Sequence, residues 1–197
     1  TSGEIKQFLS KKDQFVFRSS PGFFKQCYFL LQREPLKTMR MLDMRVLDAG
    51  SMAIIALGYA FVNRDMIRHG LEAVTQANTV AMMFVGCLSS LWGALFISRE
   101  MPMVQREASE GVSIFALFTT LNIYNTAVDL LIRSLAYSLP FFYITGYNMT
   151  FLSFFVVCFG TAWSCSAIGM LLACVMDARS AIGLSVSVTI LFGAVLN

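Results

Sequence analysis

The stretch SLAYSLPFFYITGYNMTFLSFFVVCFGTAWSCSAIGMLLACVM, residues 134–176, decides the fold because none of its 43 residues carries a charge. A helix needs roughly 20 apolar residues to cross the hydrocarbon core of a bilayer, so this stretch holds two spans. Gly146 and Asn148 are turn formers near its middle. The pattern predicts spans over residues 128–145 and 151–176.

Three more apolar segments flank this stretch, at residues 46–62, 73–98 and 181–197. The composition agrees with a membrane protein, since 56% of the residues are hydrophobic and the mean hydropathy is +0.65. Charged residues make up 14%, whereas soluble domains carry about 25%. We therefore predict an all-α integral membrane protein with about five transmembrane helices, and a soluble domain is excluded.

An amphipathic helix is predicted before the first span, over residues 22–36. Its apolar residues recur at positions 23, 24, 27, 28, 30 and 31, with Lys25 and Arg33 near the edge of that face. Such a helix lies in the membrane interface rather than across it, and a soluble surface helix is the alternative. Pro35 ends or kinks it. The polar residues 1–21 are predicted to form a linker from an upstream domain.

The basic residues indicate the orientation of the chain. Nine of the 15 Lys and Arg residues precede position 46. With the N-terminus in the cytoplasm, only Arg64 and Arg68 fall in outer loops, and cytoplasmic loops are the ones enriched in Lys and Arg. We predict a cytoplasmic N-terminus. The fifth span then ends on the outer side at Asn197, which favours a sixth span in the complete domain.

Motifs for catalysis or metal binding do not occur in the sequence. There is no G-x-x-x-x-G-K-S/T phosphate loop, no H-E-x-x-H and no G-x-S-x-G. The five cysteines form no C-x-x-C pair, and His69 is the single histidine. We expect no catalytic residue, no metal and no cofactor in this chain. A folded basic unit for nucleic acid is also missing.

Two polar features lie within or beside the predicted spans. Asp129 and Arg133 are four residues apart, which places them on one face of a helix. Charges at membrane depth are costly unless paired, so we predict an intramembrane ion pair, with a mechanistic relay between helices as the alternative. Asn148 begins an N-x-T glycosylation sequon in a very short outer loop.

The block REMPMVQREASEG, residues 99–111, carries five charges between the second and third spans. Glu100 and Glu107 are seven residues apart and so lie near one face of a helix. Gly111 is suited to end that helix. The pattern predicts a cytoplasmic loop with a short helix that contacts a soluble partner, and an ordinary charged loop is the alternative.

On these residues the chain resembles the transmembrane half of ABC transporters of the G (white/brown-complex) subfamily, which are of the ABC-2 type. The loop of that family has a glutamate, an Arg-Glu pair seven residues on, two small residues and a glycine. The matching positions here are Glu100, Arg106-Glu107, Ala108-Ser109 and Gly111, with Glu110 as an extra residue and Val112 in place of an aromatic residue. Asn125-Thr126 resembles a plant and algal branch of half-size members.

The resemblance implies a permease for lipid-like or hydrophobic cargo that pairs with a cytoplasmic domain binding ATP and Mg. Two halves, identical or different, would enclose a cavity lined by the second and fifth spans. The cavity candidates are Ala81, Val85, Leu88, Ile190 and Ala194. The coupling candidates are Glu100, Arg106, Glu107 and Gly111. Small residues in the second span also suit plain helix packing, so that alternative stays open.

Other functions remain as alternatives to an ATP-driven exporter. A non-catalytic structural subunit of a large membrane complex would explain spans without cofactor ligands. A channel or secondary carrier would place polar residues along several spans or repeat broken helices, and neither pattern is evident. The expected location is the plasma membrane, with an organelle membrane as the alternative.

Overall fold

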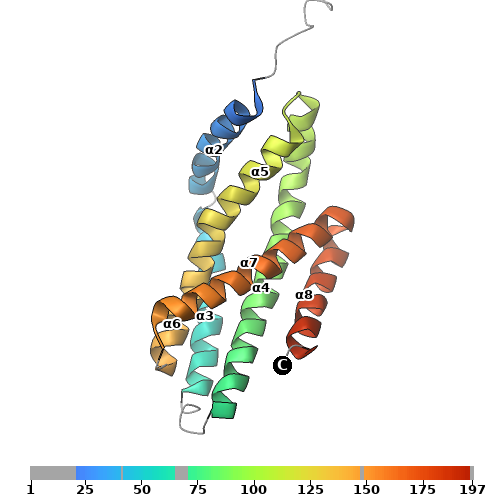
Figure 1. Ribbon diagram of the computed structural model, residues 1–197. Helices are drawn as coiled ribbons and strands as arrows, with labels where there is room; N and C mark the ends of the chain where they lie inside the picture. Colours follow the sequence, from blue (N-terminus) through green and yellow to red (C-terminus); the bar gives the residue numbers. More distant parts are fainter. Residues whose placement is uncertain (1–20, 41, 65–70, 147–148, 196–197) are drawn as a thin grey trace, which may run out of the picture.

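The computed structural model describes residues 21–40, 42–64, 71–146 and 149–195, and these ranges fold into a bundle of helices (Figure 1). The helices and their bounds are α2 Phe23–Arg40, α3 Leu42–Asn63, α4 Leu71–Ser109, α5 Ile114–Tyr124, the π-helix η2 Asn125–Leu130, α6 Leu131–Thr145, α7 Phe151–Val175 and α8 Ala178–Val195. Residues 1–20 of the predicted linker 1–21 and the sequon residue Asn148 lie outside the described residues.

Within the described residues, four helical segments are long and apolar enough to cross a membrane: Arg45–Asn63, Val74–Ser109, Ile114–Thr145 and Phe151–Val175. A shorter apolar helix follows over Arg179–Leu191. The predicted class, an all-α membrane protein, is therefore confirmed. The cytoplasmic orientation of the N-terminus stays a prediction.

Several helices differ from the predicted bounds. α2 continues through Pro35 to Arg40 instead of ending at residue 36, and the largest differences lie at the end of α4 and at the start of the third membrane segment. α4 continues through the charged block to Ser109, because Glu, Met, Gln, Arg and Ala are good helix formers. The third membrane segment begins at Ile114 instead of residue 128 and passes through the π-helix η2. Polar residues such as Asn125 lower the hydropathy of residues 114–127, so the sequence did not show that the span begins there. The side chain of Asn125 is buried within the bundle.

The core lies between α3, α4, α6 and α7. Its buried side chains include Met52, Val85, Leu130, Tyr137, Phe141, Phe154 and Cys158. Phe141 stacks on Tyr59 and on Phe154, with ring centroids 5.9 and 5.7 Å apart. These aromatic contacts join both α3 and α7 to α6 through the single residue Phe141. The outward sides of α3 and α7 carry exposed apolar residues, as expected for surfaces that contact lipid.

α4 and α7 cross with their backbones in close approach. Each helix carries the pattern Ser-x-x-Gly at the crossing, Ser90 to Gly93 in α4 and Ser166 to Gly169 in α7. A Cβ atom added to Gly93 would lie 2.3 Å from the carbonyl oxygen of Ser166, and one added to Gly169 would lie 2.0 Å from that of Ser90. The crossing therefore requires glycine at both positions. Small residues allow such close packing between membrane helices.

α2, the end of α4 and the start of α5 lie together at one end of the bundle (Figure 1). α2, coloured blue, lies beside α5, and the green helix α4 ends near the start of the yellow helix α5. This charged end of the bundle holds the ion pairs described next.

Candidate functional site

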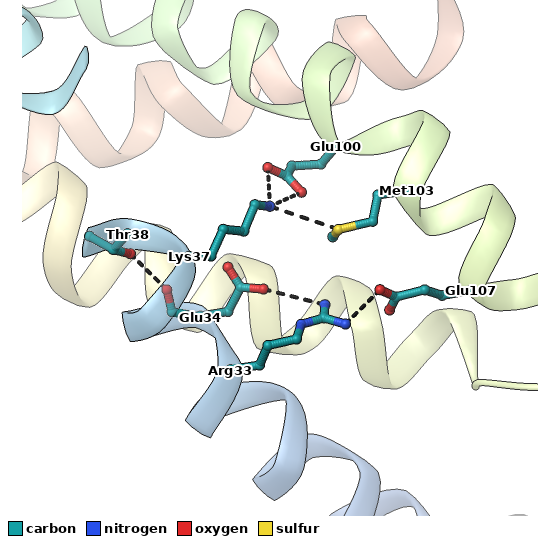
Figure 2. A network of polar contacts seen from close by, with 7 residues as sticks. All are labelled: Arg33, Glu34, Lys37, Thr38, Glu100, Met103 and Glu107. Carbon is teal, nitrogen blue, oxygen red and sulfur yellow. Dashed lines mark hydrogen bonds and ion pairs between the residues drawn. The ribbon is translucent and has the colours of Figure 1, made fainter. Parts of the chain in front are cut away.

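Two ion pairs join α2 to the end of α4 (Figure 2). Nη1 of Arg33 donates to Oε1 of Glu107 at 2.5 Å. Nζ of Lys37 lies 2.5 Å from both carboxylate oxygens of Glu100. Residues four and seven apart share one face of a helix, so the two charged residues that each helix contributes to these pairs face the other helix. The order of the pairs makes α2 and the end of α4 antiparallel.

Arg33 lies between two acidic residues, as Figure 2 shows. Its Nη2 is 3.5 Å from Oε1 of Glu34, whose side chain is buried, as is that of Glu107. Burial disfavours the charge on the Arg33 guanidinium, but the hydrogen bonds and charges of Glu107 and Glu34 together outweigh it and raise the pKa of Arg33 above its ordinary value. Arg33 therefore stays charged at every physiological pH and holds both acids.

Neutral hydrogen bonds attach α2 to the turn after α4 and to α5. The backbone N–H of Ser113 donates to Oε1 of Gln26 at 3.0 Å. The hydroxyls of Thr38 and Tyr124 are 2.5 Å apart. Together with the ion pairs, these bonds hold α2, α4 and α5 at the charged end as one unit.

The turn after α4 is formed by residues 110–112. Gly111 has a φ of +93°, a backbone conformation that residues with a Cβ atom rarely adopt. The N–H of Val112 donates to the carbonyl of Glu107 at 3.1 Å, which satisfies one of the last carbonyls of the helix. Arg106 and Gly111 are exposed. Of the four coupling candidates, Glu100 and Glu107 thus contact α2, while Arg106 and Gly111 face outward.

A second group of charges lies deeper and joins α3 to η2 and α6. Nη1 of Arg45 donates to Oδ1 of Asp129, and Nη2 of Arg133 lies 3.6 Å from Oδ2 of Asp48. The guanidinium of Arg133 also lies over the ring of Trp92, 5.1 Å from its centroid. The sequence predicted a pair between Asp129 and Arg133. The structure gives each of them an ion-pair partner on α3, and the charges of Asp129 and Arg133 also act on each other. A buried Arg or Asp needs such a partner.

Sequence reasoning missed Arg45 and Asp48 as members of this group. Asp48 was the available signal, because a carboxylate inside a predicted span needs a cation at the same depth. The sequence could not show which cation is the partner of Asp48, since Arg45, Arg99 and Arg133 all lie at or within the predicted spans.

A cavity of about 320 Å³ lies where α2, α3, α4 and the η2–α6 segment meet, and we call it the charged cavity. It is lined by Glu34, Lys37, Arg45, Asp48, Trp92, Leu95, Phe96, Arg99, Glu100, Met103, Asp129 and Arg133. It connects the two groups of ion pairs.

A larger cavity of about 550 Å³ lies between α4, α7 and α8, and we call it the apolar cavity. Its lining residues are Thr75, Asn78, Thr79, Met82, Met83, Met149, Ser153, Phe154, Val157, Thr161, Cys165, Ile168 and Thr189. None of these described residues is Asp, Glu, Lys, Arg or His. Such a cavity accepts an uncharged, largely apolar molecule.

The sequence of residues 25–196 matches the family model for the ABC-2 type transporter. The chain belongs to the ABC-2 type transporter family. It is therefore an integral membrane protein and the permease part of an ABC transporter. ABC-2 domains normally pair with a cytoplasmic ATP-binding domain. A comparison with curated proteins gave no match.

The residues predicted to line the cargo cavity of this ABC-2 permease lie in different surroundings. Ala81 and Val85 are buried in the core of the chain, and the hydroxyl of Tyr137 donates to the carbonyl of Ala81 at 3.2 Å. Leu88 is partly buried against the same core. Ile190 is exposed on α8, and the side chain of Ala194 lies outside the described residues. Met82 and Met83 of the same helix line the apolar cavity, and a cargo cavity between two halves stays a prediction.

Proposed function

We propose that this ABC-2 permease exports uncharged, lipid-like or hydrophobic molecules in an ATP-driven transporter of the G (white/brown-complex) subfamily, within the plant and algal half-size branch. The observation that carries the proposal is the apolar cavity between α4, α7 and α8. In this proposal two such halves act together in the plasma membrane.

The lining of the apolar cavity supports an amphipathic cargo. Met82 and Met83 have flexible, polarisable side chains that adapt to different apolar shapes. Ser153, Thr161 and Thr189 add a few hydroxyl groups that can orient a polar end of the cargo. A charged molecule would lose its hydration there without gaining an ion pair, so neutral cargo is favoured.

The length of α4 supports coupling to an ATP-binding domain. Its 39 residues extend about 58 Å at 1.5 Å per residue, whereas the hydrocarbon core is about 30 Å thick. The charged end of α4 therefore projects beyond the membrane, where Arg106 and Glu110 are exposed. The ion pairs of Arg33 and Lys37 would carry a movement of α4 to α2 and to the membrane segment that follows it.

A cavity-filling substitution tests the cargo site. Val157 lines the apolar cavity, and its neighbour Val156 is equally apolar and exposed but does not line it. We expect Val157→Trp to lower ATP-dependent uptake of a neutral fluorescent lipid into inside-out vesicles by about tenfold, while Val156→Trp keeps at least half of the uptake. Equal uptake by the two variants would remove the cavity from the transport path.

A further inference from the structure

The charged cavity is separate from the proposed cargo cavity and carries an even balance of charge. Among its described lining residues, four are cationic and four are anionic. Three of the cations pair with acids that also line the cavity: Lys37 with Glu100, Arg45 with Asp129, and Arg133 with Asp48. One cation and one acid therefore remain to be accounted for.

The remaining cation is Arg99, on α4. Its side chain is exposed, and no described acidic residue lies within the 4.0 Å of an ion pair. Arg99 directly follows the uncharged run of α4, residues 73–98, so it lies at the depth where lipid headgroups begin. A guanidinium at that depth can bind a phosphate with two parallel hydrogen bonds.

The remaining acid is Glu34, on α2. It is only 4% exposed, and its ion-pair partner Arg33 is 3.5 Å away. Arg33 forms its closer contact, at 2.5 Å, with Glu107. One cation thus serves two carboxylates, which leaves excess negative charge at the wall of the cavity formed by Glu34.

Apolar side chains of α4 complete the lining. Trp92, Leu95, Phe96 and Met103 recur at intervals of three, one and seven residues, close to a single face of the helix. Trp side chains are enriched at the interface between membrane and water. Among the described residues, the cavity thus combines a cation that has no ion-pair partner within 4.0 Å, an incompletely neutralised acid and an apolar surface.

We propose that the charged cavity binds a zwitterionic phospholipid whose headgroup carries a primary amine, such as phosphatidylethanolamine. The phosphate pairs with Arg99, the ammonium donates hydrogen bonds to Glu34, and the glycerol and upper acyl chain contact Trp92 and Phe96. Choline cannot donate those hydrogen bonds, and phosphatidylglycerol has no cation for Glu34. The bound lipid would join α2 to α4 at the charged end, which goes beyond the transport function proposed above.

Lipid binding to the purified, delipidated transporter tests this assignment by native mass spectrometry. We expect the wild-type protein to bind phosphatidylethanolamine about tenfold more tightly than phosphatidylcholine, the effect of a charge-assisted hydrogen bond. Arg99→Gln should weaken binding of both lipids, and Glu34→Gln should abolish only the preference between them. Arg179→Gln is the matched control, because Arg179 is an exposed arginine near the start of α8 that does not line the cavity.

Three results would overturn the proposal: unchanged affinities in Arg99→Gln, no preference between the two lipids in the wild type, or equal losses in Arg99→Gln and Arg179→Gln. Inorganic phosphate serves as competitor to distinguish a lipid from a free anion. Displacement of the lipid by inorganic phosphate at the same concentration would assign the cavity to a small anion instead. The assay does not measure transport, so its failure leaves the cargo proposal untouched.

Discussion

Substitution of Gly169 tests how closely α4 and α7 must approach. The added Cβ atom of Gly169→Ala would lie 2.0 Å from the carbonyl oxygen of Ser90, whereas ordinary contact begins at 3.4 Å. The two backbones must therefore separate locally by about 1.4 Å, because neither atom belongs to a flexible side chain. A gap of this size removes much of the dispersion energy of the neighbouring contacts.

The expected magnitude combines two opposing effects. Overpacking costs about 3 kcal/mol at the upper end of its usual range, which applies where backbone meets backbone. Replacing glycine by alanine within a helix stabilises the folded state by about 1 kcal/mol. We expect Gly169→Ala to lower the free energy of unfolding by about 2 kcal/mol.

Gly160 of the same helix offers the matched control. A Cβ atom at Gly160 would meet no atom within 4 Å, so Gly160→Ala should be neutral or stabilising by up to about 1 kcal/mol. The free energy of unfolding can be measured in mixed micelles by denaturant titration, followed by tryptophan fluorescence and helical circular dichroism. Equal stabilities of the two variants would refute the close crossing.

The reciprocal contact at Gly93 allows a second check of the same geometry. A Cβ atom there would lie 2.3 Å from the carbonyl oxygen of Ser166. Because one separation of the helices relieves both clashes, the double variant Gly93→Ala/Gly169→Ala should cost less than the sum of the single variants. Strict additivity would show that the two sites are independent.

Three further predictions concern the charged residues. Double-mutant cycles of Arg33→Ala and Glu107→Ala should give a coupling energy of about 1.5–3 kcal/mol, the range for hydrogen bonds to charged groups, and a value near zero would discount the contact. Arg106→Ala should leave ATP hydrolysis by the complete transporter intact while lowering transport, and wild-type transport rates would contradict the coupling role. Asp48→Ala should lower the free energy of unfolding by about 3 kcal/mol because the buried Arg133 loses its ion-pair partner and keeps only the charge of Asp129 nearby, whereas a loss below about 1 kcal/mol would argue against the pair with Asp48.

The helical membrane class of the chain followed from residue order alone. Two local features decided the spans. The uncharged run over residues 134–176 favours helices within the membrane, and the turn formers near Gly146 separate that run into two helices. The amphipathic pattern that begins at Phe23 is local in the same sense, and α2 forms over Phe23–Arg40. Helix hydrogen bonds close within a few residues, so such features need no knowledge of distant segments.

The surroundings of the cavity candidates show what residue order alone could not decide. In a soluble protein, apolar residues mark the inner face of a helix, but the lipid around a membrane helix is as apolar as the core. α4 and α7 carry apolar residues on most sides, so the sequence could not distinguish the buried Ala81 from the cavity-lining Met82. Only the packing of the neighbouring helices decides the rotation of each helix about its axis.

The sequence by itself determined that the chain crosses a membrane, where most of its helices lie, and that charges gather near one end of the second membrane helix. The tertiary structure decided which charges meet. It paired Glu107 with Arg33, and Asp129 with Arg45, residues 74 and 84 positions apart in the chain. The physical reason is that hydropathy and helix propensity act along the backbone, whereas ion pairs, cavities and glycine crossings depend on how separate helices approach one another.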